Sequence, residues 1–273
     1  MASLNNFNCC SEIYDCCLWY GTDSTNPEVN SDLKLLSNHT DSLNKIFNDV
    51  KLFINSLYSV YYDPIEGDIA LEGILKKNKD NFLGTIIFPS HFILEKKGFE
   101  KYLGKKIKSG FKMLRLLPKN HKYSVDAWAF KYFYEILNRW HFPVVISLDE
   151  LDITGNKQIN WKYFYDLAQK YPDIPIILDG GNAKEMVFSG YLFQVLQNTG
   201  NVYLNIHNLF AFNQVEEIVQ QFGAGKLLFD SNLPFYPEEM VIRRIGNARI
   251  INEDRSKIFG GNMKNIIKRI TVY

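Results

Sequence analysis

Eight short apolar runs, rich in β-branched residues, recur along this 273-residue chain, and their regular spacing constrains the fold more than any other feature. Most of them are almost continuously apolar, as strands buried on both faces must be. We therefore expect strands within residues 12–21, 50–56, 82–89, 111–118, 142–148, 174–181, 201–208 and 226–232.

The segments between these runs have the pattern of helices. Their apolar residues lie three and four positions apart, Asp, Asn or Ser often precedes them, and Gly or Pro often follows. We expect helices within residues 31–49, 67–80, 91–110, 124–141, 160–173, 183–200 and 212–225, and two closing helices within 238–250 and 252–270.

Strands that alternate with helices predict one parallel α/β domain over residues 1–273, and a closed (β/α)8 barrel of the TIM type fits the number of strands and the chain length. An open doubly wound sheet is the alternative. That fold more often has a glycine-rich phosphate loop after an early strand, and the sequence contains neither G-x-G-x-x-G nor a Walker A motif.

Composition argues against several classes of partner. The net charge is +1 and hydrophobic residues make up 46% of the chain, so there is a sizeable core and no overall field that would favour nucleic acid or an anionic membrane. The basic run at 96–112 is interrupted by acidic and aromatic residues and is typical of a solvated helix face. No apolar run is long enough to span a bilayer.

The four cysteines lie close together, at Cys9, Cys10, Cys16 and Cys17, so they cannot link distant parts of the fold. A secreted disulfide scaffold is therefore not expected. With no charged and apolar leader at the start of the sequence, we expect a reduced, cytoplasmic protein.

Several stretches resemble the amidohydrolase superfamily, and within it the amidohydrolase-related branch of small metal-dependent hydrolases. The order and spacing of these stretches carry the resemblance, and together they cover most of the chain. They are residues 61–78, 110–126, 142–148, 171–181, 201–206, 223–235 and 258–268.

The resemblance implies a divalent metal, zinc or another, at the C-terminal mouth of the barrel. Its usual ligands would be a His-x-His pair after strand 1, a His after strands 5 and 6, and an Asp after strand 8. In this sequence those positions hold Cys17 and Trp19, Ser147, Asp179, and Asn232. None keeps the usual residue, which predicts a mouth with no metal ligand set and no cofactor.

A substitute metal site finds little support in the same residues. Cys17 and Asp179 are good ligands, whereas Trp19 is none and Ser147 and Asn232 are weak ones for a transition metal. A catalytic zinc site normally has three protein ligands. Cys16 and Cys17 would point to opposite faces of a strand, and Cys17 acting as a nucleophile is a minority alternative.

Other polar residues lie where catalytic groups are found in this fold. His121 and His207 follow strands and are each either a general base or a polar residue bonded to a loop carbonyl. Arg115, in mid-strand, needs a partner if it is buried, and Asp179, Asp149 or a bound anion would supply one. If it points outward, it would pair with a covering helix instead.

Three hypotheses remain open from the sequence. In the first, a small polar or carboxylated molecule binds at the mouth, Asp179, His207 and His121 act as acids and bases, and Arg115, Cys17, Trp19, Ser147 and Asn232 bind the substrate. In the second, the barrel is an inactive sensor or structural partner. In the third, it is a true metallohydrolase with non-standard ligands. Barrels of this type often pair through their helices, which makes a homodimer the assembly to test.

Overall fold

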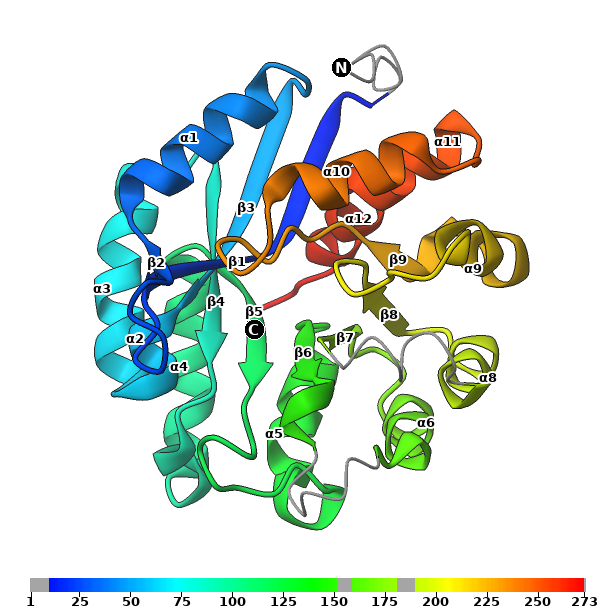
Figure 1. The fold of residues 1–273 in the computed structure, drawn as a ribbon. Coiled ribbons are helices and arrows are strands. Elements are labelled where there is room, and N and C mark those ends of the chain that lie inside the picture. Colours follow the sequence, from blue (N-terminus) through cyan, green and yellow to red (C-terminus); the bar gives the residue numbers. More distant parts are fainter. Residues whose placement is uncertain (1–9, 152–158, 181–189, 273) are drawn as a thin grey trace.

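The computed structural model describes residues 10–151, 159–180 and 190–272, and its strands form one curled sheet inside a ring of helices (Figure 1). The order in the sheet is β2-β1-β3-β4-β5-β6-β7-β8-β9. From β1 onward every neighbouring pair is parallel, and only the short β2 (Asn30–Ser31) is antiparallel. The parallel strands are β1 (Glu12–Thr22), β3 (Asp49–Ser56), β4 (Phe82–Ile87), β5 (Phe111–Leu116), β6 (Val144–Ser147), β7 (Ile176–Asp179), β8 (Val202–Asn205) and β9 (Leu227–Leu228).

Each run predicted to be a strand overlaps one of these parallel strands, and helices separate most of them. Around the sheet lie α1 (Leu33–Asn44), α2 (Leu57–Tyr61), α3 (Pro64–Lys77), α4 (Lys96–Lys108), α5 (Ala127–Arg139), α6 (Trp161–Lys170), α8 (Gly190–Asn198) and α9 (Gln214–Phe222). Asp32, Asp63 and Asn160 accept hydrogen bonds from backbone N–H groups at the starts of α1, α3 and α6, in the capping role that the sequence predicted. Residues 183–189 of one predicted helix lie outside the described residues.

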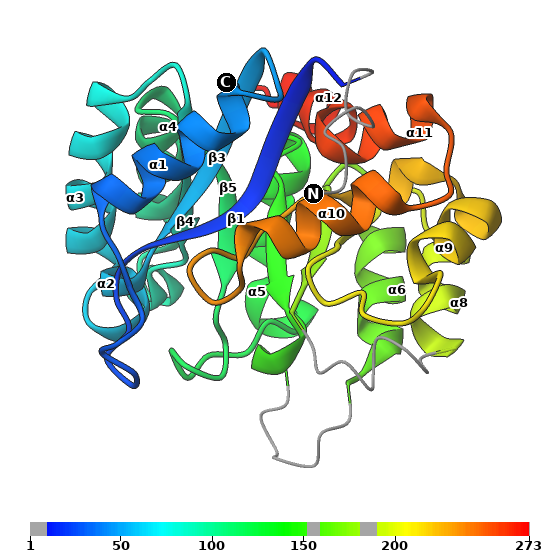
Figure 2. The same cartoon turned by 45° about the horizontal axis from the view of Figure 1, so that its top comes forward.

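The chain closes with α10 (Glu238–Asn247), α11 (Asn252–Ser256), the π-helical segment η5 (Lys257–Gly261) and α12 (Asn262–Lys268). Short 3-10 turns η2 (Ser90–Ile93), η3 (Leu148–Glu150) and η4 (Ala224–Lys226) complete the connections. Figure 2 shows α1, α3 and α4 on one side of the strands and α6, α8 and α9 on the other. Across the described parts of the chain, no helix is both long and apolar enough to cross a membrane.

The sheet curls far enough for its first strand to meet the segment that follows its last. The N–H of Cys16 donates to the carbonyl of Phe229 (3.0 Å), that of Asn232 to Cys17 (2.9 Å), and that of Trp19 to Leu233 (2.9 Å). The predicted α/β class is therefore confirmed, with a single sheet curved back toward its own beginning.

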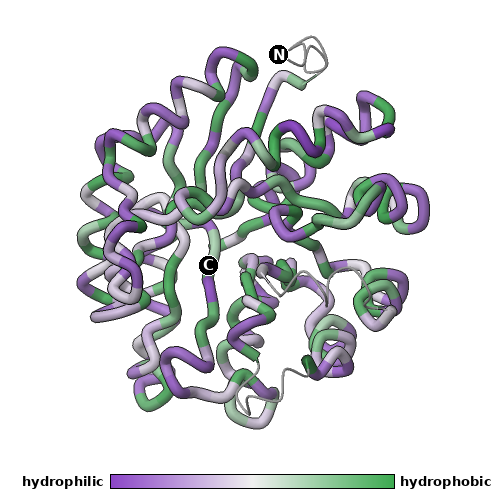
Figure 3. The backbone as a smooth tube through the Cα atoms, viewed as in Figure 1, coloured by the Kyte–Doolittle hydropathy of each residue, from purple (hydrophilic) through white to green (hydrophobic). Residues whose placement is uncertain are grey.

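Every second residue of a strand points inside the curl, and these interior side chains form an apolar layer below a polar one. The apolar layer consists of Tyr14, Cys16, Phe53, Met113, Val145, Ile177, Leu228, Met263 and Ile266. The last two belong to α12, which covers the amino-terminal end of the strands. A larger apolar cluster packs between the sheet and the surrounding helices. In Figure 3 hydrophobic and hydrophilic residues alternate along the helical segments.

Candidate active site

Polar side chains replace apolar ones two residues further along most of these strands, at their carboxyl ends. Met113 is followed by Arg115, Val145 by Ser147, Ile177 by Asp179, and Leu228 by Asp230, while Asn55 comes two residues after Phe53. In α/β barrels and sheets this edge carries the active sites. The polar layer is therefore the first place to look for chemistry.

Arg115 and Asp179 form a buried ion pair across this layer. Nη1 of Arg115 donates to Oδ2 of Asp179, and the two side chains are 1% and 6% exposed. Burial by itself raises the pKa of Asp179, but the charges of Arg115 and His207 outweigh it and the pKa lies below its ordinary value. Asp179 is therefore a carboxylate, as the sequence hypothesis of an Arg115–Asp179 pair required.

Three further groups hold the guanidinium in place. Its Nε donates to Oδ1 of Asn55 (2.9 Å), its Nη2 lies 3.3 Å from Sγ of Cys17, and its carbon lies 5.0 Å from the centre of the Trp19 ring. A cation over an indole face is attracted by the ring quadrupole. Arg115 is thus fixed in the interior by Asn55, Cys17, Trp19 and Asp179.

His207 and Asp230 form a second pair in the same layer. The N–H of His207 donates to Oδ1 of Asp230 (2.9 Å), and Nδ1 of the ring donates to Oδ2. Burial lowers the pKa of His207, but the charge of Asp230 and the hydrogen bond to it raise that pKa by more, so it lies above the ordinary value. Burial raises the pKa of Asp230, and the proton that His207 shares opposes this only in part.

The side-chain amide of Asn205 is bonded on one side only. Its Nδ2 donates to Oδ1 of Asp179 (2.8 Å), whereas its Oδ1 is buried and has no hydrogen bond from any described residue. A buried acceptor without a donor is uncommon in folded proteins. It is an oxygen available to a cation or to another donor beside Asp179.

The polar layer opens into a cavity of about 400 Å³. Trp19, Arg115, Ser147, Asp179, His207 and Asn232 line it, together with Leu57, Val60, Tyr61, Leu117, Asn120, Asp149, Glu150, Gly180, Asn208, Phe235 and Tyr236. Gly180 has φ of +70°, and a Cβ there would lie 2.9 Å from Oδ2 of Asp149 and 3.1 Å from Oγ of Ser147. The absence of a side chain at Gly180 therefore keeps this part of the wall intact.

Asn232 binds Trp19 and Cys17 at the mouth. Its Oδ1 accepts from Nε1 of Trp19 (2.9 Å) and from the thiol of Cys17 (3.6 Å), and its φ of 53° is in a region that Asn tolerates. The carboxylate expected at this strand end is supplied two residues earlier, by Asp230. A neutral amide suffices at 232 because its two partners are both neutral donors.

A break in the register of β1 explains how Cys17 reaches the interior. The pairing of β1 with β3 shifts between Asp15 and Leu18. Cys16 consequently packs in the apolar layer while Cys17 contacts Arg115, so the expectation that these neighbours point to opposite faces is wrong. Burial raises the pKa of the Cys17 thiol well above its usual range, and Arg115 offsets only part of that effect. A reactive Cys17 thiolate is disfavoured.

His121 and His39 lie away from this cluster. Nε2 of His121 bonds the carbonyl of Val60 (2.9 Å), and the residue does not line the cavity. His39, on α1, is buried behind β1, where its Nε2 lies 3.0 Å from Oδ2 of Asp15. The structure thus brings Asp179 and His207 together and leaves His121 outside.

Sequence reasoning missed Asp230, Asn55 and Asn205 as members of the site. The signal was present in the alternation of each strand, because each lies two residues beyond an interior residue, Leu228, Phe53 or Tyr203. Asp230 was passed over because the family pattern directed attention to Asn232.

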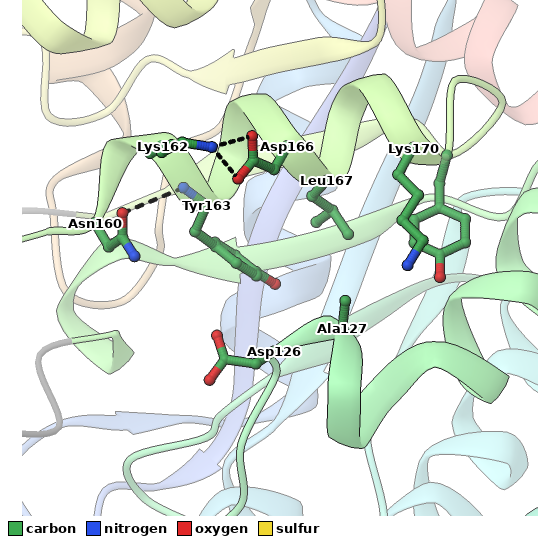
Figure 4. A pocket seen from close by; sticks show the side chains of 9 residues that line it. Asp126, Ala127, Asn160, Lys162, Tyr163, Asp166, Leu167 and Lys170 are labelled. Carbon is green, nitrogen blue, oxygen red and sulfur yellow. Dashed lines mark hydrogen bonds and ion pairs between the residues drawn. The ribbon is translucent and has the colours of Figure 1, made fainter.

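A second cavity, of about 210 Å³, lies between the start of α5 and the exposed face of α6 (Figure 4). The Nζ of Lys162 is 2.6 Å from both carboxylate oxygens of Asp166, and Oδ1 of Asn160 accepts from the N–H of Tyr163 (3.3 Å). These are helix-cap and surface pairs that bind each other, and Lys162 is 77% exposed. We assign this cavity no function.

Solved structures with a similar fold span nearly the whole chain. A dihydroxybenzoic acid decarboxylase from Polaromonas sp. JS666, with bound manganese and the inhibitor 2-nitroresorcinol, has a TM-score of 0.71 at 15% identity, covering 94% of this chain and 97% of its own. A 5-carboxyvanillate decarboxylase from Novosphingobium aromaticivorans DSM 12444, complexed with manganese and 4-hydroxy-3-methoxy-5-nitrobenzoic acid, has a TM-score of 0.64 at 14% identity, covering 96% and 97%. An amidohydrolase II has a TM-score of 0.67 at 11% identity, covering 94% and 99%.

These structures confirm, at the level of fold, the resemblance to the amidohydrolase-related branch that the sequence indicated. No protein-family model matches the sequence, and no curated protein matches it either. At such low identities the likeness concerns the arrangement of strands and helices.

The expectation of a mouth with no metal ligands and no cofactor is wrong. Ligand atoms of Cys17, Asp179 and Asp230 all lie within 4.8 Å of one another, and two proteins of this fold hold manganese. The expectation failed because Asp230 was absent from the assumed ligand set, which left only two good ligands. With Asp230, and with the unpartnered Oδ1 of Asn205 beside Asp179, the donors suit a divalent cation.

Proposed function

We propose that this chain is a (β/α)8-barrel enzyme of hydrolase type that acts on a small polar or carboxylated molecule in the cavity at the mouth. One observation carries the proposal. His207 is oriented through Nδ1 by Asp230, lines the cavity, and among the described residues no hydrogen bond engages its Nε2. An imidazole fixed in this way is suited to general acid–base catalysis.

In the proposed reaction, Nε2 of His207 takes a proton from water while the water oxygen bonds to the substrate's carbonyl carbon. The same proton then passes to the leaving nitrogen or oxygen as its bond to that carbon breaks. Asp230 keeps the proton on Nδ1 and stabilises the imidazolium that forms between the two steps. Each step moves one proton, and after the second step the histidine is neutral again.

The cavity wall supports a small polar substrate. Asn120 and Asn232 contribute amide groups to its lining and Trp19 an aromatic surface, while the hydroxyl of Tyr236 donates to Oδ1 of Asn208 (3.1 Å). Arg115 is the cation that would attract a carboxylate, although its charge is already shared with Asp179. An anionic substrate group would therefore bind chiefly through amide donors at the edge of the guanidinium.

Cys17, Asp179 and Asp230 would hold a divalent cation, with Oδ1 of Asn205 nearby. When bound, such an ion supplies Lewis-acid polarisation and lowers the pKa of water. The manganese present in two proteins of this fold supports testing the protein with and without added metal.

The test is a hydrolysis screen of small carboxylated amides, esters and lactones with the purified protein, in the presence and absence of zinc or manganese. We expect turnover that His207→Gln abolishes and that the exposed matched control His91→Gln preserves. Full activity in His207→Gln would contradict the assignment. Ligand binding without any turnover would instead favour a non-catalytic sensor.

A further inference from the structure

The guanidinium of Arg115 contacts two of the three groups that converge as metal ligands. Nη1 pairs with Asp179 and Nη2 lies 3.3 Å from Sγ of Cys17, while Cys17, Asp179 and Asp230 lie within 4.8 Å of one another. A cation from the chain itself therefore lies against atoms that a metal ion would need. The two cations require the same lone pairs.

The charges of the site make the two cations alternatives. Asp179 and Asp230 are buried; Arg115 supplies the positive charge beside Asp179, and the ring of His207 is hydrogen-bonded to Asp230. A divalent ion beside a guanidinium in a buried site would be repelled by it. Without Arg115, Asp179 would be a buried carboxylate lacking its cation, which strongly favours capture of another one.

The cavity beside Arg115 has room for a displaced guanidinium. Arg115 lines the cavity of about 400 Å³, and its contact with the Trp19 ring depends on charge and not on Asp179. Asn55 accepts from Nε of Arg115 through its Oδ1 and contacts Sγ of Cys17 through its Nδ2 (3.8 Å). Release of Asp179 and Cys17 therefore requires a side-chain movement into space that the barrel already contains.

We propose that Arg115 is an intramolecular competitor for a divalent cation at Cys17, Asp179 and Asp230, so that metal binds only when the guanidinium leaves Cys17 and Asp179. The sulfur ligand selects an ion of the zinc or cobalt type over magnesium or calcium, which prefer oxygen ligands. This inference rests on the proposed function only in placing both events in the same cavity.

The test is titration of the metal-free protein with Co²⁺, followed by absorbance and calorimetry with no substrate present. We expect Arg115→Met to bind Co²⁺ at least about tenfold more tightly than the unchanged protein does. The complex should show a thiolate-to-cobalt charge-transfer band that disappears in the double variant Arg115→Met/Cys17→Ser. The surface control Arg139→Met, whose partner is the exposed Glu100, should bind Co²⁺ as the unchanged protein does.

Arg115→Lys keeps the inference testable if Arg115→Met is unstable. A lysine retains the charge but has no fork with which to hold Asp179 and Cys17 together, so its Co²⁺ affinity should be intermediate. The inference is overturned if neither variant binds Co²⁺ more tightly than the unchanged protein, or if the band survives loss of Cys17. Because no turnover is measured, this result is independent of whether His207 is the catalytic base.

Discussion

Asp230 holds His207 at two points, with Oδ1 accepting from the backbone N–H at 2.9 Å and Oδ2 accepting from Nδ1. The backbone contact fixes the start of the loop after β8, and the side-chain contact fixes the tautomer. The proton on Nδ1 leaves Nε2 as the basic atom, on a residue that lines the cavity. Both contacts depend on Asp230, which lies two residues beyond the interior residue Leu228.

Asp230→Asn should reduce kcat by about 10²- to 10⁴-fold on any substrate that the protein hydrolyses. An amide at this position removes the charge that stabilises the imidazolium, and its NH₂ group can also support the wrong tautomer. Steady-state kinetics measures the loss, and circular dichroism confirms folding. Asp173→Asn, a change at a half-exposed carboxylate, is the control. Equal kcat in the Asp230 variant and the control would exclude this role.

The pH dependence of kcat/KM should report the raised pKa of His207. A general base must be unprotonated to act. Because Asp230 raises the pKa of His207, activity should rise with pH through a midpoint above 6.5. In Asp230→Asn the midpoint should move to lower pH, because burial lowers the pKa of His207 and the largest opposing charge is then absent, leaving only that of Asp179. A midpoint that is unchanged between the two proteins would mean that another group controls the profile.

Asp179→Asn should destabilise the fold by about 3–5 kcal/mol at pH 7, since it leaves Arg115 buried without its anion. The pKa of Asp179 is lower in the folded state, so its stabilising contribution is present above 3.8 and is lost as the pH falls through the folded value. Urea unfolding at pH 7 and at pH 4 and below measures the difference. The difference in unfolding free energy between the unchanged protein and Asp179→Asn should be largest at pH 7 and should shrink in acid. A difference that does not change with pH would contradict the ion-pair explanation.

The effect of Asp68→Asn on the free energy of unfolding should be more favourable at alkaline pH than at acid pH. Burial raises the pKa of Asp68 from 3.8 to about 7, opposed in part by Tyr102 and Lys106. A carboxyl whose pKa is raised on folding contributes stability that is full below 3.8 and is lost as the pH rises through 7, by up to roughly 4 kcal/mol. The unfolding free energy of the variant relative to the unchanged protein should increase between pH 4 and pH 8. The exposed Asp80→Asn should show no such trend.

Gly180→Ala should destabilise the fold by about 1–2 kcal/mol, because φ is +70° and the new methyl group would meet Asp149 and Ser147. Gly73→Ala is the matched control. Gly73 lies within α3 with no atom within 4 Å of the added Cβ, so alanine there should stabilise by about 0.5–1 kcal/mol. Thermal unfolding of both variants measures the contrast. Equal effects would mean that the wall of the cavity tolerates a side chain at 180.

The sequence by itself determined the order of strands and helices. A continuously apolar strand is stable only when both of its faces are covered. Apolar residues three and four positions apart form one face of a helix. Both patterns lie within short stretches of sequence and can be recognised there. For Arg115 the sequence left two orientations open, inward toward Asp179, Asp149 or a bound anion, and outward toward a covering helix. The hypotheses for Arg115, Asp179 and His207 came from their places within or at the ends of predicted strands, and for Asp179 also from the family resemblance.

Tertiary structure alone decided which polar residues meet. Arg115 and Asp179 are 64 positions apart, Cys17 and Arg115 are 98 apart, and His39 found its buried partner Asp15 across the gap between α1 and β1. The register break in β1 and the choice of Asp230 over Asn232 depend on how β1 meets the chain after β9. Contacts of this kind are set by the curvature of the whole sheet, which no short stretch of the chain encodes.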